Sequence, residues 1–144
     1  MREIPKDIWA EVLEVTTDIA WGPGQDGAEA TSGDMERFRA IYARHNAQGQ
    51  PDPFLTEVLA DFTDDAVEAI ALYRIALDQS NAYPDEPTHT KRICIASRLV
   101  EIGDFSGASE ELTVGRAEAA RLNDSEYLAL ADDLLSQVSR QAAK

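Results

Sequence analysis

The sequence predicts an all-α protein of about seven helices. Apolar residues recur three and four positions apart along most of the chain, which is the spacing of one helix face. No segment shows the alternation and β-branched enrichment of a strand. Short stretches with Pro, Gly or Asp divide the pattern into helical lengths. With 144 residues, the chain suits a single domain, 1–144, which buries enough surface to fold without a metal or a disulfide.

The first part of the chain, residues 1–50, is expected to form a helical cap. Pro5 is favourable at a first helical position, so the first helix is expected from 5 to 20. A Gly-rich loop follows at 21–33, and a second helix at 34–48. The apolar face of this second helix is Met35, Phe38, Ile41, Tyr42 and His45.

Two helices are expected on either side of the next acidic turn. Asp52 can cap the first of them, with Pro53 as its first residue. Thr63 can cap the second, which runs to about Ala82. Because this second helix is apolar nearly all round, we expect it to be central.

Three more helices complete the chain. Pro87 opens one of them and Gly103 closes it as a left-handed C-terminal cap. Asp104 caps the next helix, which ends near Leu122. The last helix is expected to begin at a capping box, Asn123-x-x-Glu126.

Two of these helices carry the same internal pattern. Ala69 stands four residues before Tyr73, and Ala108 stands four residues before Leu112. Each pair follows a short acidic turn. A small residue lets two helix backbones approach, while the large residue one turn later fills the space beside it. The repeat therefore predicts antiparallel helical hairpins that pack closely.

From about residue 53 to 138 the pattern resembles tetratricopeptide repeats, a family that stacks helix–turn–helix units of about 34 residues. The resemblance implies a right-handed stack of hairpins over 51–144, with 1–50 as a non-repeating cap. Ala69 and Ala108 are 39 positions apart, longer than the family period, and a plain helical bundle is the alternative. The residues that match the family pattern best are Ile95, Ala96, Leu99, Gly103, Asp104, Phe105, Ala108 and Leu112.

In that family the first helices of the units line a concave groove that holds a peptide or a protein surface. For Phe54, Val58 and Ile93, burial in the core is the preferred interpretation. Mapped onto this chain, the resemblance places the groove at Phe54, Val58, Asp61, Ile93, Ser97, Val100 and Glu101.

The chain is strongly acidic, with a formal net charge of −14 at pH 7. This charge disfavours nucleic acid and anionic membranes as partners and favours a protein with a basic surface. A generally acidic cytosolic protein is the alternative interpretation. Between 52 and 86 the only basic residue is Arg74. The acidic residues of this segment that would crowd near one end of a hairpin are Glu57, Asp61, Asp64, Asp65 and Glu68.

The sequence offers little for catalysis or metal binding. Two histidines and one cysteine leave no tetrahedral zinc site. Glu86-x-x-His89 has the spacing of a di-iron ligand pair, but such sites need a second motif. The glycines of 22–27 follow a helix rather than a strand, so they predict a loop and no dinucleotide site. Cys94, between two isoleucines, reads as a buried small hydrophobe. We therefore expect no catalytic residue, cofactor or metal.

These observations favour a non-enzymatic, protein-binding domain. Its sharpest form is an immunity-type inhibitor that neutralises a basic toxin or nuclease. A tetratricopeptide-like adaptor or chaperone with a peptide in its groove is the alternative, and a carboxylate-based enzyme is the least favoured. With neither a signal peptide nor a membrane span in the pattern, a cytoplasmic protein is expected; the oligomeric state stays open. The partner-binding residues are predicted to be Glu57, Asp61, Asp64, Asp65, Glu68, Ser97 and Glu101.

Overall fold

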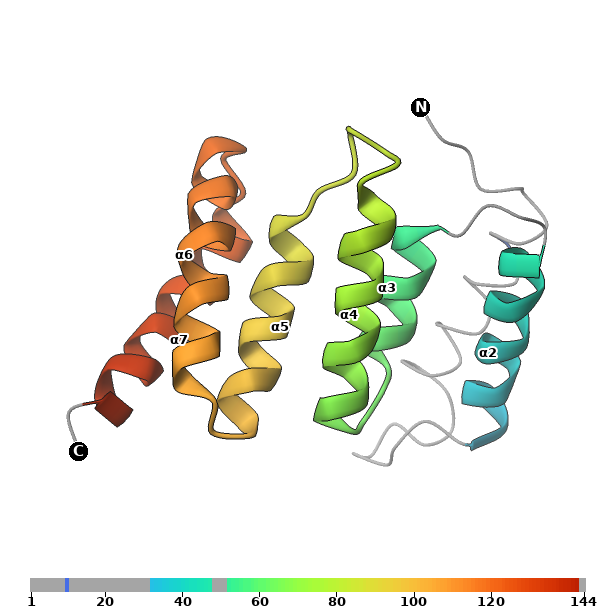
Figure 1. Cartoon of the computed structure of the whole chain (residues 1–144), viewed down its shortest axis with the longest axis horizontal. Helices are drawn as coiled ribbons and strands as arrows, with labels where there is room; N and C mark the ends of the chain where they lie inside the picture. The colour runs from blue at the N-terminus through green and yellow to red at the C-terminus, as the bar shows by residue number, and fades with distance from the viewer. Residues whose placement is uncertain (1–9, 11–31, 48–51, 143–144) are drawn as a thin grey trace.

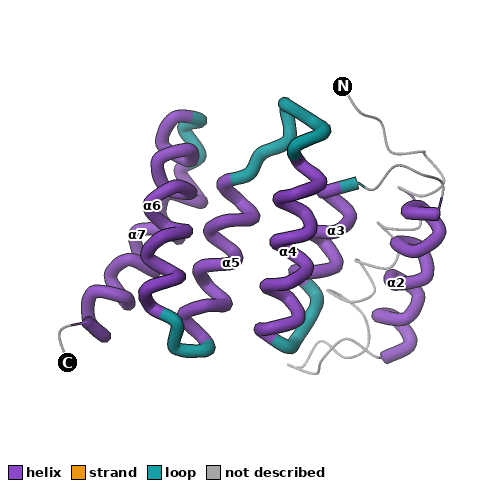
Figure 2. Tube along the Cα trace, in the orientation of Figure 1, coloured by secondary structure: helices purple, strands orange, loops and turns teal. Residues whose placement is uncertain are grey.

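The computed structural model describes residues 10, 32–47 and 52–142, which form helices joined by short turns (Figures 1 and 2). The all-α prediction is confirmed for these residues, which include no strand. The helix expected at 5–20, apart from Ala10, and residues 21–31 of the loop expected at 21–33 lie outside them. The helices are α2 (Ser32–Ala47), α3 (Pro53–Asp61), α4 (Ala66–Ser80), α5 (His89–Glu101), α6 (Phe105–Arg121) and α7 (Ser125–Ala142). Ser32 and Gly33 belong to the helix α2, so the loop prediction is wrong for these two residues.

Caps predicted from the sequence define the start of α3 but not of α4. Asp52 accepts the backbone N–H of Phe54 at 2.8 Å, and Pro53 is the first residue of α3. For α4 the predicted cap, Thr63, is wrong, because Asp65 accepts the N–H three residues later at 2.8 Å. The Thr63 hydroxyl instead donates to the carbonyl of Leu59 at 2.7 Å. It thereby satisfies an otherwise unpaired carbonyl in the last turn of α3.

The turns after α5 and α6 have the same backbone geometry. Gly103 and Asn123 are both left-handed, with φ of 82° and 57°. In each turn the next residue, Asp104 or Asp124, donates its N–H to a carbonyl five residues earlier at 2.9 Å. Each aspartate then caps the following helix, accepting an N–H three residues later at 2.9 Å and 3.3 Å, respectively. The predicted cap at Asn123 is therefore wrong, since Asn123 ends α6 and Asp124 begins α7.

Helices that follow one another in the chain pack side by side, and α7 also contacts α5. They run alternately up and down, so the α3–α4 and α5–α6 turns lie at one end of the molecule (Figure 2). The α4–α5 and α6–α7 turns lie at the opposite end. We call the end with the α3–α4 and α5–α6 turns the lower end, as it is drawn in Figure 1.

Small residues allow close approach in the main core. Ala69, Ala96 and Ala108 are fully buried. A Cβ on Gly115 of α6 would come within 2.9 Å of Ile93 Cγ1 on α5, so this crossing needs a residue without a side chain. Large apolar side chains fill the rest of the cluster: Ile70, Tyr73, Ile93, Ile95, Leu99, Leu112 and Leu134.

A second, smaller core joins α2 to α3. Phe38 and Ile41 of α2 pack with Leu55 and Leu59 of α3. Phe38, Ile41 and His45 are buried and Tyr42 is half-buried, which confirms these members of the predicted apolar face. The face of α2 predicted from the spacing is therefore the face that packs against α3.

The apolar residues that surround α4 predict a central helix, but its outer side is exposed. Val67 is 64% exposed and Ile75 is 46% exposed. Among the described helices α4 packs mainly against α3 and α5. Two neighbours cover two adjacent sides of a helix and leave the remaining stripe open.

We expect Ala108→Leu to lower the free energy of unfolding by about 1–3 kcal/mol, because the extra methylenes have no space between the helices that meet there. Ala117→Leu is the matched control, since Ala117 is exposed on the same helix; its effect should stay within about 0.5 kcal/mol. Urea unfolding followed by circular dichroism measures both. Equal effects would show that Ala108 is not a contact point between helices.

Candidate functional site

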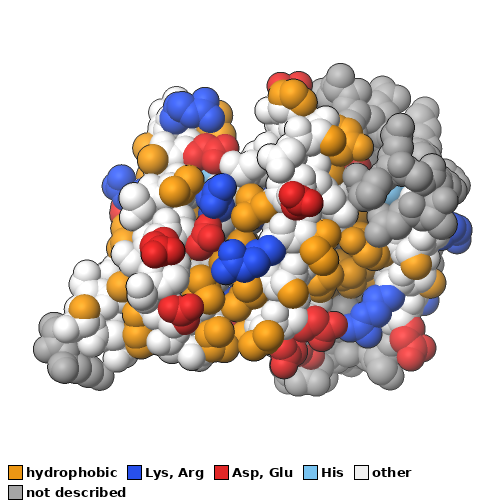
Figure 3. Space-filling view, in the orientation of Figure 1, with side chains coloured by type: hydrophobic (Ala, Val, Ile, Leu, Met, Phe, Trp, Pro, Cys, Tyr) orange, Lys and Arg blue, Asp and Glu red, His pale blue; other side chains and the backbone are white. Residues whose placement is uncertain are grey.

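Acidic side chains gather at the lower end of the molecule. Asp61 ends α3, Asp64 and Asp65 form the turn, and Glu68 lies in the first turn of α4. All four are exposed, as is Glu101 at the end of α5. Figure 3 shows acidic side chains grouped at the lower end of α4. We call the following set the acidic edge: Asp61, Asp64, Asp65, Glu68, Glu101 and Asp104.

One arginine joins the two turns that make up this edge. The Arg98 guanidinium, on α5, donates to the carbonyls of Thr63 at 2.6 Å and Asp64 at 3.1 Å. It also forms an ion pair with Glu101 at 3.3 Å. These bonds fix the end of α5 against the α3–α4 turn, so that Glu101 and the main chain of Asp64 contact the same guanidinium.

The edge stays negative after its internal bonds are counted. The Asp65 and Asp104 carboxylates serve as helix caps, where they also offset the positive ends of two helix dipoles. Glu68 lies 4.0 Å from Arg39, an exposed pair that contributes little. Among the described residues, Arg98 pairs with Glu101 and Arg39 with Glu68.

Asp61 differs from the rest of the edge. The buried Tyr73 hydroxyl donates to Asp61 Oδ1 at 2.5 Å. Burial raises the pKa of Asp61 from 3.8 to about 6, against the lowering effect of the Tyr73 hydrogen bond; the charge of Glu57 raises it further. The residue as a whole is exposed, although its Oδ1 accepts the hydrogen bond of the buried Tyr73 hydroxyl. Its charge therefore depends on pH close to neutrality.

Glu57 lies in an internal cluster instead of on the acidic edge. The Lys91 side chain is fully buried, and its ammonium bonds Glu57 at 3.3 Å, Glu86 at 2.9 Å and the Pro87 carbonyl at 2.8 Å. Thr90 adds a bond to the second Glu57 oxygen at 2.7 Å. All three ammonium protons therefore have acceptors. We call this set (Glu57, Glu86, Pro87 and Lys91) the lysine cluster.

The remaining groove residues are divided between the core and the surface. Ile93 is fully buried in the main core, and Phe54 and Val58 pack on the smaller core. These three side chains therefore pack in or on the cores, which agrees with the interpretation preferred from the sequence. Ser97 and Val100, on α5, are half-buried.

The sequence motifs with possible chemistry have separate partners. Glu86 bonds Lys91, whereas His89 Nε2 lies 2.7 Å from Asp124 Oδ2. That bond holds the pKa of Asp124 below its ordinary value. Burial raises the pKa of the half-buried Cys94 thiol to about 11, so the thiol stays protonated at neutral pH. No group of three or more His, Cys, Asp or Glu within 32–47 and 52–142 is arranged to hold a metal ion.

Two members of the site, Arg98 and Asp104, were not predicted as parts of it. Asp104 was recognised as a helix cap only. Asp104 could have been placed at this edge from the sequence, because antiparallel hairpins bring alternate turns to the same end of a stack. Arg98 stands three residues before Glu101, a spacing at which helical side chains meet.

None of the described helices has the length and apolar character needed to cross a membrane. Comparison of the chain with protein-family models, curated proteins and solved structures gives no match. The function must therefore be argued from the geometry and charge of this chain.

We expect Lys91→Met to destabilise the fold by about 3–5 kcal/mol, because two carboxylates would remain buried without their cation. Arg121→Met is the control, since Arg121 is exposed and lies 4.0 Å from its partner; its effect should be below about 1 kcal/mol. Adding Glu57→Gln and Glu86→Gln to Lys91→Met should restore part of the loss. Chemical denaturation measures all of these variants. A Lys91→Met protein as stable as the control would contradict the role of the cluster.

The Asp61 contribution to stability should fall as pH rises. Its pKa of about 6 in the folded protein lies above the ordinary 3.8, so the folded state holds the proton more tightly. Relative to Asp61→Asn, the natural protein should therefore lose stability between about pH 4 and pH 6, with no further change above about pH 7. Tyr73→Phe should raise the pKa of Asp61 further. Carboxyl carbon NMR and denaturation across this interval test both; a midpoint near 3.8 would refute them.

Proposed function

We propose that this protein is a non-enzymatic binding domain that docks the basic surface of another protein on the acidic edge. The observation that carries the proposal is the convergence of two turns, through Arg98, into one exposed row of carboxylates. Such a row attracts a positively charged surface and speeds its approach. The net charge of −14 adds to the same field.

The edge also has the rigidity that a docking surface needs. Asp65 and Asp104 hold the starts of α4 and α6, and Arg98 holds the α3–α4 turn. A surface that is ordered before binding loses less conformational entropy in the complex. The lysine cluster also fixes α3 next to the edge, because Lys91 binds Glu57, one helical turn before Asp61 on α3.

In its sharpest form the proposal is an immunity-type inhibitor. Enzymes that cut nucleic acid need a basic cleft, because the substrate is a polyanion. An acidic edge that covers such a cleft would exclude the substrate. The partner would be a basic toxin or nuclease, and its inhibition would weaken as salt screens the contact.

Edge residues free of helix-capping roles give the clearest test. We expect Asp64→Lys, Glu68→Lys and Glu101→Lys together to weaken binding to a basic partner at least about tenfold at low salt, mainly through slower association. The control reverses Asp85, Glu110 and Glu126, which are exposed elsewhere and give the same net charge. Pull-down with washes of rising salt identifies the partner, and stopped-flow mixing measures association.

Partners retained equally by both triple variants would overturn the acidic edge as the docking site. Glu57 is unsuitable for this test, because its reversal would break the lysine cluster. Once a basic partner is identified, its nuclease activity with and without the protein tests the inhibitor form.

The alternative is a tetratricopeptide-like adaptor that binds a peptide in a concave groove. It is favoured by the contacts between first helices of successive hairpins: Glu57 of α3 bonds Thr90 and Lys91 of α5, and α5 packs on α7. Binding of this kind should resist salt and survive edge reversal. Ser97→Trp, which would fill the middle of such a groove, should abolish it.

A further inference from the structure

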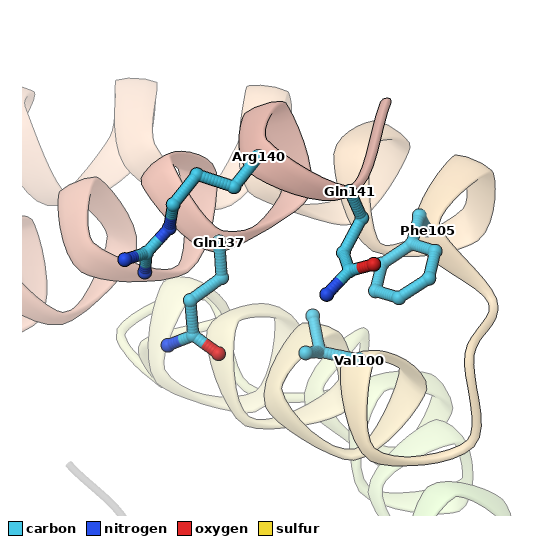
Figure 4. Close-up of a pocket in the computed structure, with 5 residues that line it drawn as sticks. All are labelled: Val100, Phe105, Gln137, Arg140 and Gln141. Carbon is cyan, nitrogen blue, oxygen red and sulfur yellow. The ribbon is translucent and has the colours of Figure 1, made fainter. Parts of the chain in front are cut away.

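A pocket of about 400 Å³ lies between the end of α5, the start of α6 and the end of α7 (Figure 4). This volume falls within the range of small-molecule sites, about 300–1,000 Å³. No residue of the acidic edge lines it. The lining residues are Val100, Phe105, Gln137, Arg140 and Gln141.

The pocket has a polar side and an apolar side. In Figure 4 the polar ends of Arg140 and Gln137 lie on one side, and Val100 and the Phe105 ring lie on the other. The Gln141 amide extends between them. Val100 and Phe105 are half-buried, so part of their apolar surface remains open to a ligand. A matching molecule needs a compact apolar body and one polar head.

The charge of the lining is opposite to the charge of the protein. The chain has 27 acidic and 13 basic residues, yet among the residues that the structure describes the lining includes one arginine and no carboxylate. Arg98, Arg116 and Arg121 each have an ion-pair partner. Arg140 has none within the described ranges 32–47 and 52–142, so its guanidinium is available to an anion.

The acidic residues next to the pocket in sequence are already engaged. Glu101 pairs with Arg98, and Asp104 caps α6 through the Gly107 N–H. Repulsion from them is partly offset by these contacts. It still disfavours a ligand with several negative charges, which leaves a single charge as the best match.

We propose that this pocket binds a small organic monocarboxylate with an aromatic or branched aliphatic body. The Arg140 guanidinium binds the carboxylate, for which its planar fork is suited. Val100 and Phe105 cover the apolar body, and the glutamine amides border the head group. The lining residues are distinct from those of the acidic edge.

The test is an NMR titration of the full chain with hydrocinnamate, its neutral amide and the amine of equal length. The side-chain amide signals of Gln137 and Gln141 report on the pocket directly. We expect hydrocinnamate to shift them saturably, and the amide and amine to bind at least about tenfold more weakly. The absence of saturable shifts up to about 10 mM acid, or equal binding of the amine, would overturn the proposal.

Variants separate the pocket from general effects of charge. Arg140→Gln should weaken hydrocinnamate binding about tenfold. Arg121→Gln makes the same change in net charge at the opposite end of α6 and should leave binding unchanged. Because Arg140 is exposed, its replacement should not affect folding, which circular dichroism can check. Phe105→Leu reduces the apolar wall of the pocket and should also weaken hydrocinnamate binding. If Arg140→Gln binds hydrocinnamate with the affinity of the natural protein, the proposed site is refuted.

Discussion

The buried Lys91 ammonium is the constraint on which the arrangement of the hairpins depends. A lysine with no exposed surface must have acceptors for its protons, and these are Glu57 of α3 and, in the α4–α5 segment, Glu86 and the Pro87 carbonyl. Removing a charge from water costs several kcal/mol unless partners compensate. The two hairpins therefore meet in the one register that brings Glu57 and Glu86 to Lys91.

At the lower end of α5, Arg98 also fixes this helix against the first hairpin. Lys91 and Arg98 are two helical turns apart, so both project from α5 toward the first hairpin. Toward the first hairpin, Lys91 binds the Glu57 carboxylate, whereas Arg98 binds the backbone carbonyls of Thr63 and Asp64. Ile95, which lies between these two residues, and Leu99, which follows Arg98, supply apolar contact with the main core. Charge selects the register of α5, and apolar burial supplies most of the favourable free energy.

The two surfaces of interest follow from this register but differ in chemistry. The acidic edge consists of charges on turns and helix ends, with Asp61 tied to the core through Tyr73. The pocket between α5, α6 and α7 has an apolar wall and one arginine. The first suits recognition of a large charged surface, and the second suits enclosure of a small molecule. Neither requires the other to be occupied.

The helices and several of their ends could be predicted from local sequence patterns, although α5 begins at His89 and not at Pro87. Apolar spacing predicted all six described helices, and Asp52, Gly103 and Asp104 act as predicted, because caps depend on local backbone geometry. Local signals were insufficient where two capping residues stood close together, as at Thr63 and Asp65. The packing of the helices places Glu57 inside a buried cluster, whereas Glu101 and Asp104 belong to the acidic edge. Such partners are distant in sequence, and no local propensity encodes which charged side chain will lose its contact with water.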